Sequence, residues 1–187
     1  MAETSKAYDR RIKEGFFDKY VKEPIIDIGV GRIDTHDGAD PLTPTCDTWD
    51  KDNGNAELME SVKDNTYNTV YNSHLLEHLN HPMTAIRNWY RITKKGGHLI
   101  ICVPDRDSYE RKTTMPSKWN GDHKYFMTLD LNEPPCTFSI KTMIATALKN
   151  EKYKLVEART INTCTNNDKP TEHGDREYQI EVVIKKL

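Results

Sequence analysis

A short apolar run, Ile25-Ile26-Asp27-Ile28-Gly29-Val30-Gly31, constrains the fold of this chain more than any other stretch. Its branched apolar residues indicate a strand that is buried on both faces, as in a parallel sheet. The two glycines allow the backbone to turn sharply and to approach a ligand closely, although such turns also occur for structural reasons alone. Ligands of open α/β sheets bind beyond the carboxyl ends of the strands. The run therefore predicts an α/β fold with a nucleotide-type site after its first strand.

Length and composition favour one soluble domain over residues 1–187. The formal net charge of −2 gives no basic face for nucleic acid. The four cysteines lack metal-ligand spacing, so we interpret them as free thiols in a reducing compartment and predict no metal site. The polar N-terminus and the absence of a long apolar run predict a cytoplasmic protein without a membrane partner.

The N-terminal segment, residues 1–22, carries aromatic and branched residues at intervals of three to four. This spacing predicts one amphipathic helix over residues 6–21 that covers one face of the sheet. Arg10 and Arg11 are interpreted as part of its solvated face. The alternative is that Tyr8 or Arg11 closes over the ligand, where a guanidinium can meet a carboxylate.

The region after Gly31 departs from an ordinary nucleotide-binding unit. Residues 32–44 hold prolines, a glycine and aspartates that cannot sustain a helix, so we predict a reduced first crossover. Residues 46–50 predict a second strand, and Asp50 lies 19 residues after Gly31. An acid about 20 residues after the glycines binds the ribose diol in nucleotide-binding folds. Residues 54–59 indicate a turn and the start of a helix, so either the third strand is vestigial or this strand is itself the third.

The middle of the chain predicts a parallel strand–helix–strand unit. Residues 67–71 are typical of a strand, and the helical spacing that starts after Pro82 continues to a glycine pair, Gly96-Gly97. Residues 98–103 form the most apolar strand of the chain.

The last third of the chain begins with a long polar segment, residues 105–135, which we interpret as a substrate lid. Ser139 is the predicted N-cap of a helix that extends to Asn150. Residues 153–161 and 178–184 predict a terminal antiparallel pair of strands.

Three stretches together carry a family resemblance: Asp27-Ile-Gly-Val-Gly31, Ser73-His-Leu-Leu-Glu-His-Leu79 with Pro82, and Arg91-Ile-Thr-Lys-Lys-Gly-Gly-His-Leu-Ile-Ile-Cys-Val-Pro104. They resemble the class I S-adenosylmethionine-dependent methyltransferases, in particular the small type 11 group. The resemblance implies a Rossmann-like sheet of seven strands, mostly parallel with an antiparallel C-terminal strand. It also implies S-adenosylmethionine as the cofactor.

The resemblance assigns cofactor-binding roles to residues at three strand ends. Asp27, Gly29 and Gly31 would surround the methionine part, and Asp50 would bind the ribose. Asn55-Ala56 resembles the family's Gly-Asp-Ala turn beside adenine, with an amide oxygen available for the exocyclic amino group. Ser73 would lie near the sulfonium. The third family glycine is absent, and for the same reason an oxidoreductase that uses a dinucleotide is disfavoured.

Methyl transfer to a hydroxyl needs a general base, and three residues are candidates. His74 leads by position, His123 in the lid is second and Asp105 is third; each could equally serve in packing. His78 is interpreted as orienting the helix start or a loop, with Glu77 as its partner.

Polar and aromatic residues of the lid suit a saccharide, so we predict an O-methyltransferase that acts on a saccharide or another small hydroxylated metabolite. The alternatives are a small aromatic or amine acceptor, or a non-catalytic cofactor-binding partner subunit.

Overall fold

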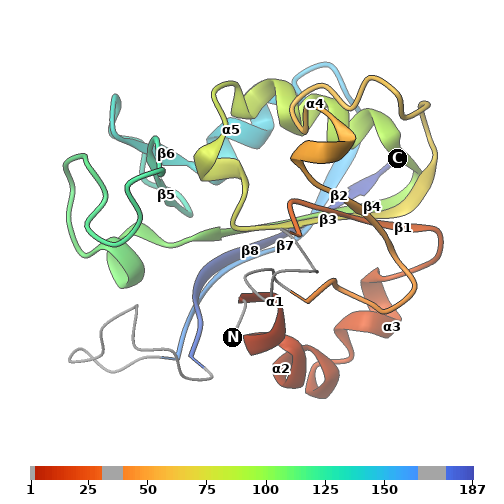
Figure 1. Cartoon of the computed structure of the whole chain (residues 1–187), viewed down its shortest axis with the longest axis horizontal. Coiled ribbons are helices and arrows are strands. Elements are labelled where there is room, and N and C mark those ends of the chain that lie inside the picture. The colour runs from red at the N-terminus through yellow and green to blue at the C-terminus, as the bar shows by residue number, and fades with distance from the viewer. Residues whose placement is uncertain (1–2, 31–39, 164–175) are drawn as a thin grey trace.

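A computed structural model of the chain describes residues 3–30, 40–163 and 176–187. Its helices are α1 (Glu3–Lys6), α2 (Tyr8–Lys13), α3 (Phe16–Tyr20), α4 (Pro82–Ile92) and α5 (Ile140–Ala147). Its strands are β1 (Ile25–Ile28), β2 (Asp47–Trp49), β3 (Tyr67–Ser73), β4 (Thr93–Pro104), β5 (Phe126–Thr128), β6 (Thr137–Ser139), β7 (Tyr153–Asn162) and β8 (Tyr178–Lys186). Figure 1 shows a central sheet between two helical layers, with α4 and α5 on one face and the N-terminal helices on the other.

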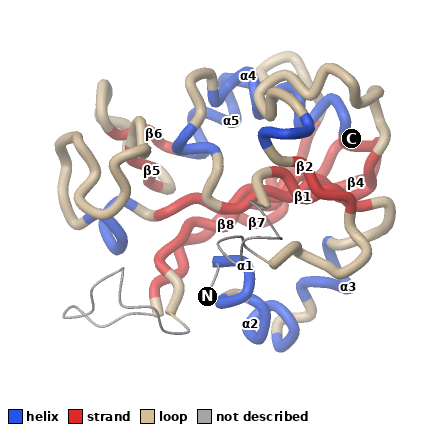
Figure 2. Tube along the Cα trace, in the orientation of Figure 1, coloured by secondary structure: helices blue, strands red, loops and turns tan. Residues whose placement is uncertain are grey.

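The main sheet has six strands in the described part of the chain, in the order β2-β1-β3-β4-β8-β7. Figure 2 shows the strands in red, with helices in blue on both sides of the sheet. The pairs β1–β2, β1–β3 and β3–β4 are parallel, whereas β8 is antiparallel to both β4 and β7. The predicted α/β class, with a mostly parallel sheet and an antiparallel C-terminal strand, is confirmed. Because β2 pairs with β1, it is the second strand and not the third.

The first strand has the burial that its sequence predicts. All four residues of β1 are buried, and alternate side chains enter two separate cores. Ile26 and Ile28 pack in the core under α4 and α5, with Trp89. Ile25 packs in the core on the side of α3, with Phe16. This burial on both faces explains why the strand contains branched apolar residues without alternation.

The prediction of one N-terminal helix over residues 6–21 is wrong. The segment contains two short helices, α2 and α3, after α1 has ended at Lys6, and Gly15 adopts a left-handed backbone with φ 65° between them. A right-handed helix cannot continue through such a residue. Arg11 is not solvated either, because only 1% of its surface is exposed.

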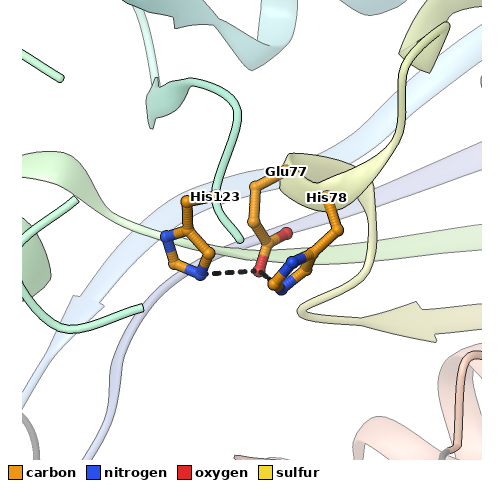
Figure 3. A group of neighbouring side chains, drawn as sticks. All are labelled: Glu77, His78 and His123. Carbon is orange, nitrogen blue, oxygen red and sulfur yellow. Dashed lines mark ion pairs between the residues drawn. The ribbon is translucent and has the colours of Figure 1, made fainter. Parts of the chain in front are cut away.

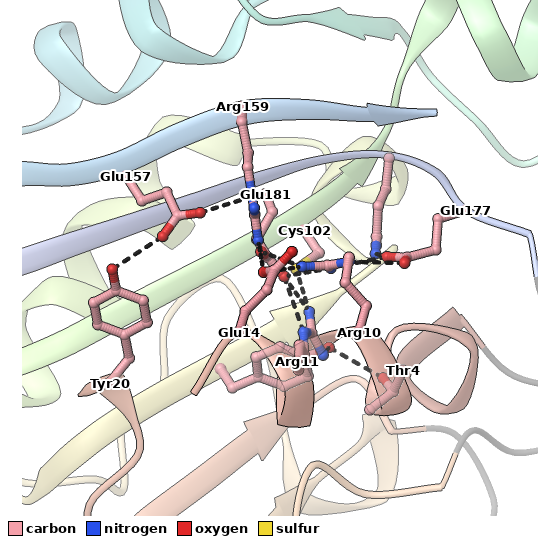
Figure 4. Close-up of polar contacts among 12 residues, drawn as sticks. Thr4, Arg10, Arg11, Glu14, Tyr20, Cys102, Glu157, Arg159, Glu177 and Glu181 are labelled. Carbon is pink, nitrogen blue, oxygen red and sulfur yellow. Dashed lines mark hydrogen bonds and ion pairs between the residues drawn. The ribbon is translucent and has the colours of Figure 1, made fainter. Parts of the chain in front are cut away.

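Arg11 belongs to a buried ion network between α2 and the far strands of the sheet (Figure 4). Its Nε donates to Oε2 of Glu181 on β8 at 2.9 Å. Arg10 and Arg159 donate to the same carboxylate at 3.1 and 2.9 Å. The carboxylate that Arg11 meets is therefore a protein side chain, and this network fastens the N-terminal helices to the sheet.

The network makes the free energy of unfolding sensitive to acid. Burial would raise the pKa of Glu181, but the charges of Arg11 and Arg10 and the hydrogen bonds outweigh it and lower the pKa to about 2, from an ordinary 4.5. A carboxyl group whose pKa is lower in the folded state stabilises the fold at pH values above its unfolded-state pKa. This stabilisation is lost as the pH falls through the folded-state pKa. We expect Glu181 to contribute about 3 kcal/mol at neutral pH, lost between about pH 5 and pH 2.

Denaturant unfolding across this pH range checks the contribution of Glu181. Glu181→Gln should lower the free energy of unfolding at neutral pH and flatten its acid dependence. The matched control is Glu133→Gln, because the carboxylate of Glu133 also pairs with an arginine, Arg106, but is 55% exposed and screened by water. An acid dependence that stays unchanged in Glu181→Gln would contradict the assignment.

The βαβ unit is confirmed, but the glycine pair does not end the helix. Helix α4 ends at Ile92, and β4 begins at once with Thr93, so Gly96 and Gly97 lie inside the strand. A Cβ atom on Gly97 would lie 2.6 Å from the backbone oxygen of Asn68 on β3. Glycine is thus required by the close approach of the two strands, where their register also shifts.

The segment 105–135 contains secondary structure and buried residues. A π-helical turn spans Arg106–Glu110, and β5 pairs in parallel with β6 just beyond the segment. His123, Phe126 and Met127 are buried. Ser139 caps α5 as predicted, since its side chain accepts a hydrogen bond from the Thr142 backbone. No helix within the described ranges is long and apolar enough to cross a membrane.

Candidate active site

The carboxyl ends of β1, β2 and β3 meet at one edge of the sheet. Gly29 follows β1, and its backbone N–H donates to the Trp49 oxygen at the end of β2, at 2.7 Å. The φ angle of Gly29 is +86°, and a Cβ atom there would lie 2.8 Å from Leu75 Cδ2, just beyond β3. The left-handed backbone therefore favours glycine, and a side chain there would also displace the Leu75 side chain. Gly31 and most of the predicted reduced crossover, residues 32–44, lie outside the described residues.

Asp27 holds the chain that returns from the first crossover. The carboxylate is buried, and its Oδ2 accepts a hydrogen bond from the Leu42 backbone at 2.8 Å. Burial raises the pKa of Asp27 to about 7, against that hydrogen bond and the charge of Arg11, which lower it. This contact gives Asp27 a structural role, and its place beside the cofactor remains a prediction.

The predicted ribose and adenine contacts lie after β2. Asp50 is the N-cap of the short turn Lys51–Asn53: its backbone oxygen accepts from the Asn53 backbone at 2.8 Å, and its backbone N–H donates to Asn53 Oδ1 at 2.9 Å. The expected helix at residues 54–59 is absent, because this stretch forms turns. The Asn55 Oδ1 accepts from the Glu57 backbone at 2.7 Å, and its second lone pair is the one available for the predicted adenine contact. Ala56 lies beside it, and its carbonyl accepts from Trp89 Nε1 at 2.8 Å.

Ser73 ends β3 at the level of the Gly29 turn, since Ile28 pairs with Asn72 in the preceding register position. Its Oγ is buried and has no hydrogen-bond partner among the described residues. A buried hydroxyl without a partner is costly and uncommon in folded proteins. Ser73 therefore marks a place where a ligand atom or water completes the structure.

A cluster of histidines surrounds Glu77, which lies on the 3₁₀ turn Leu76–His78 directly after β3 (Figure 3). The Glu77 side chain is fully buried. Its Oε1 lies 3.9 Å from His74 Nδ1, 3.7 Å from His78 Nε2 and 3.8 Å from His123 Nε2. The structure thus brings together two of the three predicted base candidates, His74 and His123. It also pairs His78 with Glu77, as predicted.

His74 sits at a sharp turn between β3 and the 3₁₀ turn. Its φ angle is 52°, in the left-handed region that histidine adopts more readily than most side chains. The backbone N–H of His74 donates to the Cys102 oxygen on β4 at 2.9 Å. This hydrogen bond holds the turn against the neighbouring strand.

His123 is held by a second buried carboxylate, Glu110, which the sequence did not reveal. The distance from His123 Nδ1 to Glu110 Oε1 is 2.8 Å. Ser117 Oγ and the Lys118 backbone donate to the same carboxylate. Burial would raise the pKa of Glu110, but the hydrogen bonds from His123, Ser117 and Lys118 outweigh it and lower the pKa. No local pattern links His123 to an acid 13 residues earlier.

His78 is uncharged at neutral pH. Burial lowers its pKa to about 4, and the neighbouring His123 and His74 act in the same direction.

The third base candidate, Asp105, lies in a different setting. Its Oδ2 accepts from the backbone and the hydroxyl of Ser108 at 3.0 and 2.7 Å, and it caps the π-helical turn. Burial raises the pKa of Asp105, and its catalytic role stays a prediction.

A match to a known protein family identifies the kind of protein that carries this site. A family model described as "Methyltransferase domain" matches residues 11–162 of the chain. The match spans well over half of the sequence. The chain belongs to this methyltransferase family.

Solved structures share the fold of this methyltransferase. A possible histamine N-methyltransferase from Thermotoga maritima aligns at TM-score 0.55 and 17% identity over 100% of both chains. A putative S-adenosylmethionine-dependent methyltransferase from Listeria monocytogenes aligns at 0.56 and 13%, over 98% of both chains. The [4+2]-cyclase SpnF aligns at 0.52 and 15%, over 94% of this chain and 80% of its own. No curated protein sequence matches the chain.

The cofactor of the methyltransferase is S-adenosylmethionine. The described residues fit it, because the unpartnered Ser73 Oγ and the side-chain-free Gly29 face the same edge of the sheet. The carboxylate of Asp50, at the end of β2, has the chemistry that a ribose diol needs. This expected binding role of Asp50 is compatible with its cap, since the backbone of Asp50 exchanges hydrogen bonds with Asn53 and a carboxylate accepts several more.

Proposed function

We propose that this methyltransferase transfers the methyl group of S-adenosylmethionine to a hydroxyl of a saccharide or another small hydroxylated molecule. The observation that carries the proposal is the convergence of His74 and His123 on the buried Glu77 at the carboxyl end of β3. A hydroxyl is hardly ionised at neutral pH and must lose its proton as it attacks. A histidine beside the cofactor edge supplies the base that this reaction needs.

His74 suits the role of base better than His123. The His74 side chain is 17% exposed, whereas that of His123 is 3% exposed and its Nδ1 contacts Glu110. Glu77 lies 3.9 Å from His74 Nδ1 and would stabilise the positive charge that His74 gains with the proton. Glu77 is thus the positioning and charge-balancing partner of the base.

S-adenosylmethionine, when bound, supplies a methyl carbon that its sulfonium has already activated. The chain must hold the acceptor oxygen in line with that carbon and keep water out. His74 would accept the hydroxyl proton while the oxygen–carbon bond forms and the carbon–sulfur bond breaks, with the neutral thioether as the leaving group. Gly29 and Ser73 position the donor side, and residues 105–135 cover the acceptor side.

The saccharide preference is supported by Trp119 in the segment 105–135. Its indole N–H is buried without a hydrogen-bond partner in the described structure, and an aromatic ring with a free donor suits a sugar. Two other polar candidates of the segment are already engaged. The Tyr125 hydroxyl donates to the Leu79 oxygen, and Asn120 Oδ1 accepts from the Asp122 backbone. Trp119 is therefore the residue we propose to contact the acceptor.

Incubation with methyl-labelled S-adenosylmethionine and a panel of acceptors tests the proposal. The panel contains monosaccharides, nucleotide sugars, small phenols and amines; histamine serves as the amine arm because of the Thermotoga neighbour's description. We expect label on hydroxylated acceptors, and we expect Trp119→Ala to raise the KM for them with a smaller effect on kcat. Label transfer to amines alone would contradict the proposal.

A further inference from the structure

We propose that Glu77, His78 and His123 bind one divalent transition-metal ion of the zinc class, and that this ion fastens residues 105–135 to the end of β3. One carboxylate oxygen and two imidazole nitrogens converge there, and these three ligand atoms all lie within 4.8 Å of one another. Figure 3 shows the two histidines approaching the Glu77 carboxylate from different segments. The inference goes beyond the proposed function and requires neither acceptor nor cofactor.

The spacing of the three side chains is close to that of a metal site. Ligand atoms around a tetrahedral zinc lie about 3.3–3.5 Å apart, since each bond measures about 2.0–2.2 Å. Glu77 Oε1 lies 3.7 Å from His78 Nε2 and 3.8 Å from His123 Nε2. Shifts of a few tenths of an ångström bring these two pairs to coordination distance, and the two imidazole nitrogens, within 4.8 Å of each other, close on the ion from opposite sides of the carboxylate oxygen by a larger side-chain rotation.

Glu110 gives the site the outer contact that metal-bound histidines have. It lies 2.8 Å from His123 Nδ1, and in the neutral imidazole this contact places the proton on Nδ1 and the lone pair on Nε2, which faces Glu77. A divalent cation between this nitrogen and the Glu77 oxygen would bind both. Glu110 is itself fixed by Ser117 and Lys118, so the orientation of His123 is set before any ion arrives.

The donor set selects the kind of metal. Two imidazoles and one carboxylate suit zinc and similar transition ions, whereas Mg²⁺ prefers an all-oxygen shell. Three protein ligands leave one position open, as in sites that also hold water or substrate.

The ion would strengthen an existing contact between two parts of the fold. The Lys124 backbone already donates to the Glu77 backbone oxygen at 2.9 Å, next to His123. His78 and His123 also pack ring against ring, with centroids 4.8 Å apart. Coordination would add a bond between the segment 105–135 and the turn Leu76–His78, so metal binding should order that segment.

Calorimetric titration of chelator-treated full-length protein with ZnCl₂, CoCl₂ and MgCl₂ tests the site. We expect one equivalent of Zn²⁺ or Co²⁺ to bind, a Co²⁺ absorption spectrum typical of low coordination number, and much weaker Mg²⁺ binding. Zn²⁺ should also slow amide hydrogen exchange in residues 105–135. Glu110→Gln should weaken Zn²⁺ binding by about 10–100-fold, and His78→Gln and His123→Gln should weaken it further.

His81→Gln is the matched control, because the His81 side chain is 73% exposed and pairs with Glu57 outside the cluster. It should bind Zn²⁺ as the unmodified protein does. His78 is partly exposed, so His78→Gln should fold normally, and its thermal unfolding checks this. Substoichiometric binding, equal binding by His78→Gln and His123→Gln, or a preference for Mg²⁺ would each overturn the proposal. Because the metal titration contains no methyl acceptor, its outcomes do not test the proposed methyl transfer, which is tested separately.

Discussion

Replacing His74 by alanine should lower the turnover of a hydroxylated acceptor by about 10²–10⁴-fold, the usual loss when a general base is removed. The affinity for S-adenosylmethionine should stay nearly unchanged, because the predicted cofactor contacts lie on the Gly29 turn, Asp50 and Ser73. Turnover at saturating acceptor and calorimetric cofactor binding separate the two effects.

His81→Gln serves as the control for this experiment as well, since His81 is exposed and is not part of the histidine cluster. It should keep its turnover. A His74→Ala variant with the turnover of the unmodified protein would show that His74 is a packing residue. His123 would then be the next candidate to test, and Asp105, just beyond β4, the one after it.

Replacing Gly29 by valine should abolish measurable cofactor binding and lower the free energy of unfolding by about 2–5 kcal/mol. Two physical costs combine at this position. The φ angle of +86° is strained for a branched side chain, and its Cβ would lie 2.8 Å from Leu75 Cδ2. Denaturant unfolding and cofactor titration measure the two consequences.

Gly96→Val separates the cost of backbone strain from the cost of steric overlap. Gly96 also has a positive φ, of +78°, but a Cβ there would meet nothing within 4 Å. It lies in the first half of β4, at the opposite end of the strand from the candidate site. This control should lose stability through strain alone and should bind the cofactor normally. Retained cofactor binding in Gly29→Val would contradict the placement of the cofactor at this turn.

The elements that were predicted correctly are specified by patterns of residues adjacent in the sequence. β1 and the apolar half of β4 are buried on both faces, so unbroken apolar runs specify them. The antiparallel arrangement of β7 and β8 also follows from local pattern, because two long strands share one connection.

The features that were missed depend on partners far away in sequence. The burial of Arg11 is set by Glu181, a residue 170 positions later, so its helical neighbours indicated only a polar face. Gly15 occurs inside a helical pattern, and only its backbone angle shows that it ends a helix. β5 and β6 have three residues each, too few for a periodic signal.

The candidate site was predicted only in part, again because some of its contacts join residues that are far apart in the sequence. His74 and His123 were named from their positions, and the fold places both next to Glu77. The role of Glu110 depends on how residues 105–123 fold back, which no spacing predicts. Asp27 and Asn55 have structural hydrogen bonds, to Leu42 and Glu57, that the motif alone does not show.

The position of the transferred methyl group tests the central claim most directly. The protein is incubated with ¹³C-methyl S-adenosylmethionine and the best acceptor of the panel, and the product is examined by NMR. The account predicts a ¹³C-methyl group bonded to oxygen, formed by the unmodified protein and about 10²–10⁴-fold more slowly by His74→Ala. A methyl group bonded to nitrogen, formed equally fast by both proteins, would contradict it.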